Sequence, residues 1–187
     1  RHHIATDIGL KVLKDGGNAI DAAVAVGFAL SVVNPSAGNL GGGGFMLIHL
    51  SEKNETIAID YRERAPIQSS EKMFQDQDGN VINGLSLNST LASGVPGTVS
   101  GMFYVSEKFG IKNIKSLINP SVEIAKKGFI LSKFQASNLN KYKEKFLKNP
   151  EAKEIFTRPE GFAEGDILIQ KNLANTLSRI AKNGKEE

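Results

Sequence analysis

The chain of 187 residues contains the stretch Asn34–Phe45, NPSAGNLGGGGF, in which four glycines, Gly41 to Gly44, follow one another. Glycine has no side chain to pack, so the run indicates a close approach to the backbone or dihedral angles closed to other residues. A phosphate-binding loop is not favoured, because no Gly-Lys-Ser/Thr follows and the run leads into a strand instead of a helix. We therefore expect these glycines to be close-packing backbone that leads into a central strand.

Two helices are predicted before this stretch. Thr6–Leu13 has helical apolar spacing and ends at Gly16-Gly17, which is typical of a glycine stop. Asn18 then stands at an N-cap position, with Asp21 three residues later near the positive end of the next helix. That helix, Ala19–Val33, is apolar almost all round and is expected to be buried, and Asn34-Pro35 ends it.

A β-hairpin is predicted after the stretch, from Phe45–Leu50 and Thr56–Tyr61. The first strand is nearly continuous in apolar residues, which indicates that both its faces are covered and that His49 is a core residue. Residues 63–95 are turn-rich, and Asp76–Asn80 is interpreted as a polar turn because its spacing does not fit a calcium loop. Further helices are expected at Gly97–Phe109, Ser121–Lys127, Lys133–Leu147 and Lys171–Lys182. The pattern predicts an α+β chain forming one domain over residues 1–187, with an α/β core at 1–101 and mainly helical cover at 102–187, and the resemblance described below implies that this domain is partial.

Composition narrows the classes of function. Hydrophobic residues make up 40% of the chain and the net charge is only +3, with acidic residues interspersed among the lysines, so no nucleic-acid partner is expected. The absence of cysteine excludes disulfides and thiolate chemistry. The longest apolar stretch, Ala22–Val33, is too short to span a bilayer. The sequence begins without Met or a signal-peptide pattern, which leaves export open.

Arg62 is the main candidate for a binding residue. It follows the second predicted strand, and its guanidinium offers a planar fork that matches a carboxylate with two hydrogen bonds. The residues alone favour a different role, an ion pair with Asp60 or Glu63. No Gly-x-Ser-x-Gly elbow is present, and the three histidines are dispersed, so neither a complete catalytic apparatus nor a metal or cofactor site is predicted.

Several ordered motifs resemble the N-terminal part of a γ-glutamyltranspeptidase. They are Leu13–Ala25 (LKDGGNAIDAAVA), Asn34-Pro35 with Gly38 and Gly41–Phe45, Tyr61-Arg62-Glu63 with Ala65-Pro66, and Ala92–Gly101 (ASGVPGTVSG). Beyond Gly101 the similarity is weaker, with Asn119-Pro120 and Ala125–Phe129 as further points.

The resemblance implies an N-terminal nucleophile hydrolase with an αββα sandwich, made as a precursor that cuts itself into a large and a small subunit. The nucleophile would be the N-terminal Thr of the small subunit, its partner from the same precursor, with the Thr α-amino group as base. It would attack the γ-glutamyl amide of glutathione or a similar donor, and water, an amino acid or a peptide would then accept the γ-glutamyl group. Arg62 matches the arginine that binds the donor's α-carboxylate, so the resemblance reverses the interpretation of Arg62 given above. No catalytic residue, cofactor or metal ligand is carried onto this chain.

Other expectations follow from the same resemblance. The chain is interpreted as part of a large subunit, truncated at both ends and inactive alone, and located in the bacterial periplasm or secreted. Two alternatives stay open, a related acylase of the same fold (a cephalosporin acylase or a poly-γ-glutamate processing enzyme) and a non-catalytic scaffold module. Retention of Arg62 favours a γ-glutamyl donor.

Overall fold

The computed structural model describes residues 2–187. It forms two compact units. The helical unit consists of the residues up to Gly38 together with Ser106–Glu187, and the hairpin unit is Asn39–Val105. These bounds differ from the predicted division after residue 101, because the first two helices pack with the C-terminal part of the chain.

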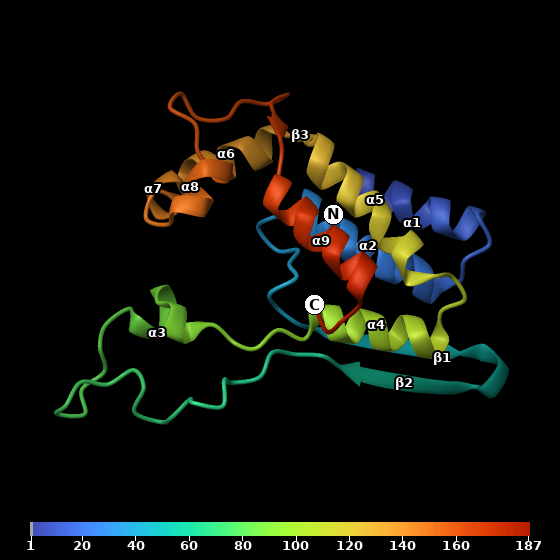
Figure 1. The fold of residues 1–187 in the computed structure, drawn as a ribbon, viewed down its shortest axis with the longest axis horizontal. Coiled ribbons are helices and arrows are strands. Elements are labelled where there is room, and N and C mark those ends of the chain that lie inside the picture. The colour runs from blue at the N-terminus through green and yellow to red at the C-terminus, as the bar shows by residue number, and fades with distance from the viewer. Residues whose placement is uncertain (1) are drawn as a thin grey trace. The chain divides into compact units, whose positions relative to one another are not determined.

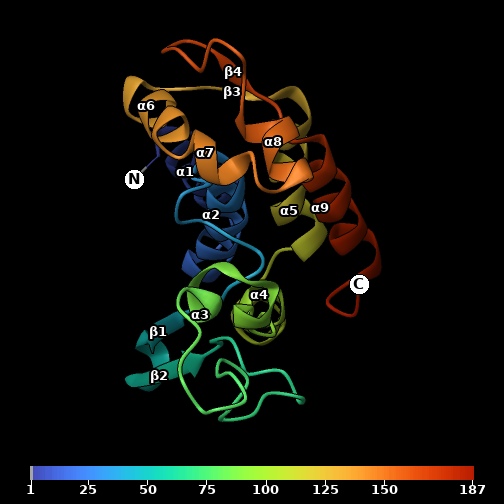
Figure 2. The same cartoon turned by 90° about the vertical axis from the view of Figure 1, so that its left-hand side faces the viewer.

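Four helices form the body of the helical unit: α1 (His3–Lys14), α2 (Ala19–Val33), α5 (Ile114–Lys127) and α9 (Lys171–Asn183). Helix α2 packs against α1 and α5, and α5 packs against α9 (Figures 1 and 2). Because α2 is apolar on nearly every side, it lies at the centre, and Val24, Ala25, Phe28, Ala29, Val32 and Val33 are each at most 1% exposed. The predicted burial of this helix is confirmed.

The start of α2 is fixed by the predicted cap. The Asn18 side chain accepts hydrogen bonds from the N–H groups of Ile20 and Asp21, and the Asp21 carboxylate accepts one from the N–H of Asn18, which makes a capping box. Asp21 is 0% exposed and also accepts hydrogen bonds from the N–H groups of Ile111 and Lys112. This carboxylate therefore joins the start of α2 to the segment that precedes α5.

The end of α2 is capped by two glutamine side chains from distant segments. Gln135 Nε2 donates to the Val33 carbonyl at 2.8 Å, and Gln170 Nε2 donates to the Val32 carbonyl at 2.8 Å. The last carbonyl groups of a helix have no partner within it, so these side chains satisfy groups that would otherwise be buried without hydrogen bonds.

The remainder of the helical unit contains shorter elements. They are β3 (Phe129–Ile130), α6 (Lys133–Lys141), α7 (Lys143–Phe146), α8 (Pro150–Phe156) and β4 (Ile167–Leu168), with β3 and β4 antiparallel. The helix predicted over Lys133–Leu147 is broken at Tyr142, and the helix predicted from Ser121 begins at Ile114 and passes through Pro120.

The hairpin unit is built on β1 (Phe45–Leu50) and β2 (Glu55–Asp60). The strands are antiparallel, and their register pairs Phe45 with Asp60 at one end and Leu50 with Glu55 at the other. The expectation that both faces of the first strand are covered is wrong for the described residues. Phe45 and Leu47 are 65% and 76% exposed while Ile48 is 4% exposed, because the strand pairs with β2 alone and alternates its side chains between two faces. His49 is likewise exposed and not a core residue, and its Nδ1 lies 3.1 Å from Thr56 Oγ1.

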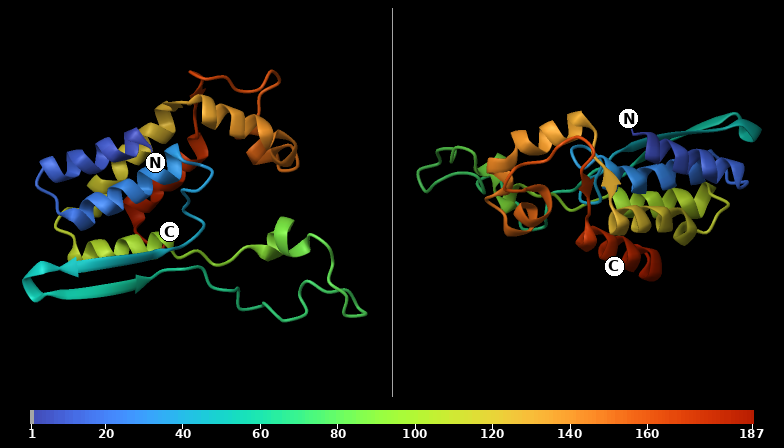
Figure 3. Two further views of the ribbon diagram at one scale, coloured as in Figure 1. Left: turned by 180° about the vertical axis from the view of Figure 1, so that it is seen from behind. Right: turned by 90° about the horizontal axis from the view of Figure 1, so that it is seen from above.

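Residues 61–97 form a long arm between the hairpin and α4 (Thr98–Phe109), as Figure 3 shows. The arm contains α3 (Leu85–Asn88) and an antiparallel bridge between Arg64 and Val95 that brings its two ends together. The polar turn predicted at Asp76–Asn80 is confirmed, since Asp76 Oδ1 accepts hydrogen bonds from the N–H groups of Asp78 and Asn80.

The α+β class predicted from the sequence is confirmed, with helices dominating one unit and a hairpin the other. Among residues 2–187 no helix is long and apolar enough to cross a membrane.

Candidate functional site

Arg62 lies two residues beyond the end of β2, where Asp60 holds it. Its Nη2 and Nε donate to the two carboxylate oxygens of Asp60 at 3.1 and 3.3 Å, and its backbone N–H donates to Asp60 Oδ1 at 3.0 Å. The Arg62 guanidinium lowers the pKa of Asp60, and Asp60 in turn raises the pKa of Arg62, chiefly through these hydrogen bonds. The two groups are therefore a charged pair over the whole physiological pH range.

One face of the Arg62 guanidinium lies over an aromatic ring. Its Cζ is 4.8 Å from the centroid of Phe45, the residue that faces Asp60 across the hairpin. Attraction between a cation and the face of an aromatic ring stabilises this arrangement. Asp60 and Phe45 thus contact the same guanidinium from two directions.

Glycines make room for the backbone that carries Arg62. A Cβ on Gly43 would stand 2.6 Å from Arg62 Cα, and a Cβ on Gly97 would stand 2.8 Å from the Arg62 carbonyl oxygen. Gly101 packs in the same way against the side chain of Tyr61, where its Cβ would stand 2.9 Å from Cδ2. Burial in these surroundings raises the pKa of the Tyr61 hydroxyl. Each contact is too close for a real Cβ, so only glycine fits at these positions.

The glycine run itself serves different purposes along its length. Gly42 accepts hydrogen bonds from the N–H groups of Gly97 and Thr98 at 2.8 and 3.0 Å, which ties the run to the start of α4. Gly43 and Gly44 pack against Tyr61 and Arg62, as expected of close-packing backbone. For Gly41 that expectation is wrong, because nothing lies within 4 Å of the position of its Cβ.

Tyr61, Arg62, Gly97 and Gly101 border a groove of about 540 Å³ in the hairpin unit. Its lining consists of Ile59, Asp60, Tyr61, Arg62, Arg64, Val95, Pro96, Gly97, Ser100, Gly101 and Tyr104. Arg62 is 61% exposed there, so its remaining donors are accessible from solvent. Since the accessible guanidinium of Arg62 borders it, the groove is suited to a small ligand that carries a carboxylate.

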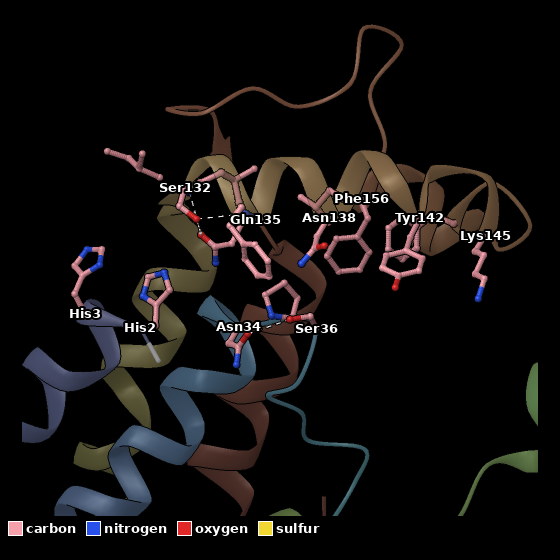
Figure 4. Close-up of a pocket in the computed structure, with 16 residues that line it drawn as sticks. His2, His3, Asn34, Ser36, Ser132, Gln135, Asn138, Tyr142, Lys145 and Phe156 are labelled. Atoms are coloured by element: carbon pink, nitrogen blue, oxygen red, sulfur yellow. Dashed lines mark hydrogen bonds between the residues drawn. The ribbon is translucent and has the colours of Figure 1, made fainter.

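A second hollow, of about 670 Å³, lies in the helical unit between the start of α1, the end of α2 and helices α6 to α8 (Figure 4). Several of its polar side chains are hydrogen-bonded locally, whereas the buried His2 Nδ1 has no hydrogen-bond partner among the described residues. Ser132 and Gln135 form the capping box of α6, and Ser36 Oγ donates to Asn34 Oδ1 at 3.1 Å. His2 stacks on His3, and burial lowers the pKa of His2. No hydrogen bond joins either serine to a histidine in the described chain, so this hollow lacks an activated nucleophile.

Residues 2–187 contain no group of three or more His, Cys, Asp or Glu placed to hold a metal ion. The groove at Arg62 likewise contains no pair of nucleophile and base. The described residues provide a fixed, accessible cation, the Arg62 guanidinium, beside a groove. This arrangement is typical of a binding site and not of a complete catalytic centre.

Comparison with known proteins identifies the family. The sequence profile described as Gamma-glutamyltranspeptidase matches residues 5–187, nearly the whole chain.

The chain belongs to the γ-glutamyltranspeptidase family. The resemblance stated from the sequence motifs is thereby confirmed.

Individual members of the γ-glutamyltranspeptidase family are also similar over almost the full chain. It is 48% identical over 186 residues to the Glutathione hydrolase proenzyme of Pseudomonas sp. (strain A14), covering 98% of this chain and 32% of that protein. The same identity is found over 185 residues with the Glutathione hydrolase proenzyme of Escherichia coli (strain K12), again covering 98% and 32%. The chain therefore spans about a third of the length of these curated relatives.

A comparison with solved structures also finds a γ-glutamyltranspeptidase. The crystal structure of Helicobacter pylori gamma-glutamyltranspeptidase superposes with a TM-score of 0.94 at 48% identity, covering 98% of this chain and 53% of that one. Cephalosporin acylase from Bacillus halodurans gives a TM-score of 0.80 at 22% identity, covering 97% of this chain and 34% of that one, which shows the fold alone. The chain carries part of the N-terminal nucleophile hydrolase fold, as the resemblance implied.

The sequence did not single out two of the residues around Arg62. Asp60 was considered only as a competing ion-pair partner, and Phe45 only as a strand residue. The signal for both lies in the hairpin register, because a turn of known length between the two strands places Phe45 opposite Asp60. The length of that turn cannot be read from Ser51–Asn54 alone, since these residues fit several turn types.

Proposed function

We propose that this chain is the large-subunit part of a γ-glutamyltranspeptidase that cleaves the γ-glutamyl amide of glutathione. The γ-glutamyl group would then pass to water, an amino acid or a peptide. The observation that carries the proposal is Arg62, an accessible guanidinium at the edge of a groove in a chain of this family. The names of the two glutathione hydrolase relatives support the choice of donor.

In this proposal Arg62 binds the α-carboxylate of the γ-glutamyl donor. A guanidinium and a carboxylate form two parallel charge-assisted hydrogen bonds, which fix the direction of the bound group as well as its position. With the α-carboxylate held in this way, the γ-carbonyl is placed a fixed distance along the glutamyl chain. The role of this chain is to position the donor, and it needs neither a metal nor a cofactor to do so.

The bond-breaking step would be performed by a Thr at the N-terminus of a small subunit from the same precursor. Its hydroxyl oxygen would attack the γ-carbonyl carbon while its own α-amino group takes the proton, and the C–N bond would break as that proton passes to the leaving amine. Water or an acceptor amine would then attack the acyl-enzyme and release the Thr. The word proenzyme in the relatives' names, and their threefold greater length, support a second subunit.

The test replaces Arg62 in the full-length protein. We expect Arg62→Gln to raise KM for a γ-glutamyl anilide about 100-fold, because loss of one partner of a hydrogen-bonded charge pair costs about 2–5 kcal/mol. Arg62→Lys keeps the charge but loses the fork, and we expect an intermediate KM. Arg64→Gln, the other arginine bordering the groove, is the comparison and is expected to change KM less than about threefold.

Two results would contradict the proposal: a wild-type protein without γ-glutamyl anilide hydrolysis, and an Arg62→Gln variant with unchanged KM. Hydrolysis by the isolated 187-residue chain would contradict the placement of the nucleophile on another subunit. Mass analysis of the full-length product tests the scaffold alternative, since a non-catalytic module would not cut itself. The acylase alternative is not favoured, because the likeness to cephalosporin acylase is one of fold. Export to the periplasm or the medium stays a prediction of the family resemblance.

A further inference from the structure

The guanidinium of Arg62 has two edges that can each bind a carboxylate, and Asp60 occupies only one of them. The side edge, formed by Nε and Nη2, donates to the two oxygens of Asp60 at 3.3 and 3.1 Å. The end edge consists of Nη1 and the second hydrogen of Nη2, and none of its donors is bonded to a residue in the part of the chain that the structure describes. An internal ion pair and a bound ligand are therefore compatible at this arginine.

Phe45 further restricts the orientation of the guanidinium. Arg62 Cζ lies over the Phe45 ring, 4.8 Å from its centroid, and the hairpin register places Phe45 directly opposite Asp60. A planar cation held at one edge and over one face has its remaining edge fixed in space. The hairpin thus supplies both contacts from one rigid pair of strands.

We propose that Asp60 and Phe45 are positioning residues that orient the Arg62 guanidinium so that its end edge receives the donor's α-carboxylate. This inference rests on the proposed function. It adds that the end edge of the guanidinium binds the carboxylate and that Asp60 and Phe45 hold the guanidinium in the required orientation. A free arginine side chain would lose rotamer freedom on binding, and holding it beforehand removes part of that cost.

Stability does not explain the Asp60–Arg62 pair. The two side chains are 54% and 61% exposed, and exposed ion pairs add little to folding free energy. The side-on bidentate pair, which the backbone N–H of Arg62 reinforces, instead fixes the orientation of the guanidinium.

A competing effect has the opposite sign and can be measured. The Asp60 carboxylate repels a second carboxylate at the other edge of the same guanidinium, so its removal alone would tighten donor binding. In an exposed groove this repulsion is screened by water and salt, whereas the loss of orientation is not. We therefore expect orientation to dominate and KM to rise when Asp60 is replaced.

The variants are made in the full-length protein. Asp60→Asn keeps an oxygen for the backbone N–H of Arg62 and removes the charge, while Asp60→Ala removes both. We expect KM for a γ-glutamyl anilide to rise about fivefold and about 20-fold respectively, with kcat changed less than threefold. Phe45→Leu keeps apolar volume without the aromatic face, and we expect a two- to threefold rise in KM. Glu55→Gln replaces the other carboxylate of β2, at the far end of the hairpin, and is expected to leave both parameters unchanged.

A donor analogue separates orientation from a general structural effect. In the wild type, a donor with an α-carboxamide in place of the α-carboxylate is expected to have a much lower kcat/KM than the carboxylate donor, because it gains little from Arg62. In Asp60→Ala the ratio of kcat/KM between the carboxylate and carboxamide donors is expected to fall about 10-fold. Self-cleavage of each precursor, followed by mass, shows that the variant has folded.

The outcomes distinguish the two proposals. If the wild type does not discriminate against the carboxamide donor, the proposed role of Arg62 fails. If it does discriminate and the Asp60 variants keep the same ratio and the same or a lower KM, the inference about Asp60 is overturned and the residue is a competitor for the guanidinium. An unchanged KM in Phe45→Leu overturns the part of the inference that concerns Phe45.

Discussion

Gly97 lies so close to Tyr61 that a Cβ on Gly97 would stand 2.8 Å from the Tyr61 carbonyl carbon. The peptide that links Tyr61 to Arg62 is therefore held against the segment that begins α4. Any side chain at residue 97 must displace either that peptide or the start of the helix, and displacement of the peptide moves the Arg62 guanidinium with it.

We expect Gly97→Ala to destabilise the protein by about 1–3 kcal/mol through overpacking. The same substitution should raise KM for the γ-glutamyl donor, because Arg62 is displaced from its contacts with Asp60 and Phe45. Urea unfolding and steady-state kinetics of the full-length protein measure the two effects.

Gly41→Ala is the matched control within the glycine-rich segment. Nothing lies within 4 Å of the position of its Cβ, so we expect a change of less than about 0.5 kcal/mol and an unaltered KM. If Gly41→Ala proved as harmful as Gly97→Ala, close approach would not be the reason for glycine at residue 97.

Asp21→Asn is expected to destabilise the protein by about 2–3 kcal/mol. The carboxylate is 0% exposed and both its oxygens accept backbone hydrogen bonds, so an amide would turn N–H donors toward other donors. Thermal or urea unfolding measures the change. Asp7→Asn, at an exposed position of α1, should stay within about 0.5 kcal/mol, and equal losses for the two variants would contradict the role of Asp21.

Gln170→Ala is expected to cost about 1–3 kcal/mol, because it leaves the Val32 carbonyl buried without its partner. Gln135→Ala removes the corresponding bond to the Val33 carbonyl, from a less buried side chain, and should cost less. Hydrogen exchange at the last turn of α2 provides a local measurement. A Gln170→Ala variant that unfolds like Gln68→Ala, an exposed position of the arm, would show that the cap does not contribute.

Asp60 should titrate at an unusually low pH. Because Arg62 lowers the pKa of Asp60, the ion pair persists at neutral pH and is lost only as the pH falls through the lowered pKa. In Arg62→Gln the pKa of Asp60 should rise toward that of an unpaired aspartate, as followed by carbon NMR of the carboxyl group. The pKa of Asp76, lowered mainly by the backbone N–H of Asn80, should stay the same in this variant. An unchanged pKa of Asp60 in Arg62→Gln would mean that the ion pair does not form.

Local signals in the sequence were sufficient for much of the fold. Gly16-Gly17 and the cap formed by Asn18 and Asp21 marked the boundary between the first two helices, and the structure has α2 at Ala19–Val33 as predicted. These signals succeed because a capping box depends on residues within one turn of each other.

Other elements depended on contacts that the sequence does not display. The sequence predicts a helix only from Ser121, yet α5 begins at Ile114 and continues through Pro120, because Leu117 and Ile118 are 2% and 0% exposed and their burial offsets the lost hydrogen bond. Helix α8 was missed although Asn149 caps it and Pro150 opens it, a pattern typical of a helix start.

At the candidate site, the sequence singles out Arg62 but not the residues around it. The family motifs pointed to the arginine, whereas the roles of Gly97 and Gly101 depend on which backbone approaches them in space. The predicted covering of both faces of β1 failed for a related reason. An apolar strand indicates that cover is needed, but Phe45 and Leu47 remain 65% and 76% exposed among the described residues.

The two glutamine caps of α2 also bear on the order in which the chain folds. Gln135 and Gln170 follow their carbonyl partners by 102 and 138 positions. At a synthesis rate of about 5–20 residues per second, the end of this apolar helix waits roughly 7–28 s for the second of them. The hairpin unit, Asn39–Val105, is continuous in sequence and is complete on the ribosome before either glutamine is made. The nascent chain therefore carries the hairpin with Arg62 early, while the face of α2 that α5 covers in the finished fold remains an exposed hydrophobic surface of the kind that chaperones bind.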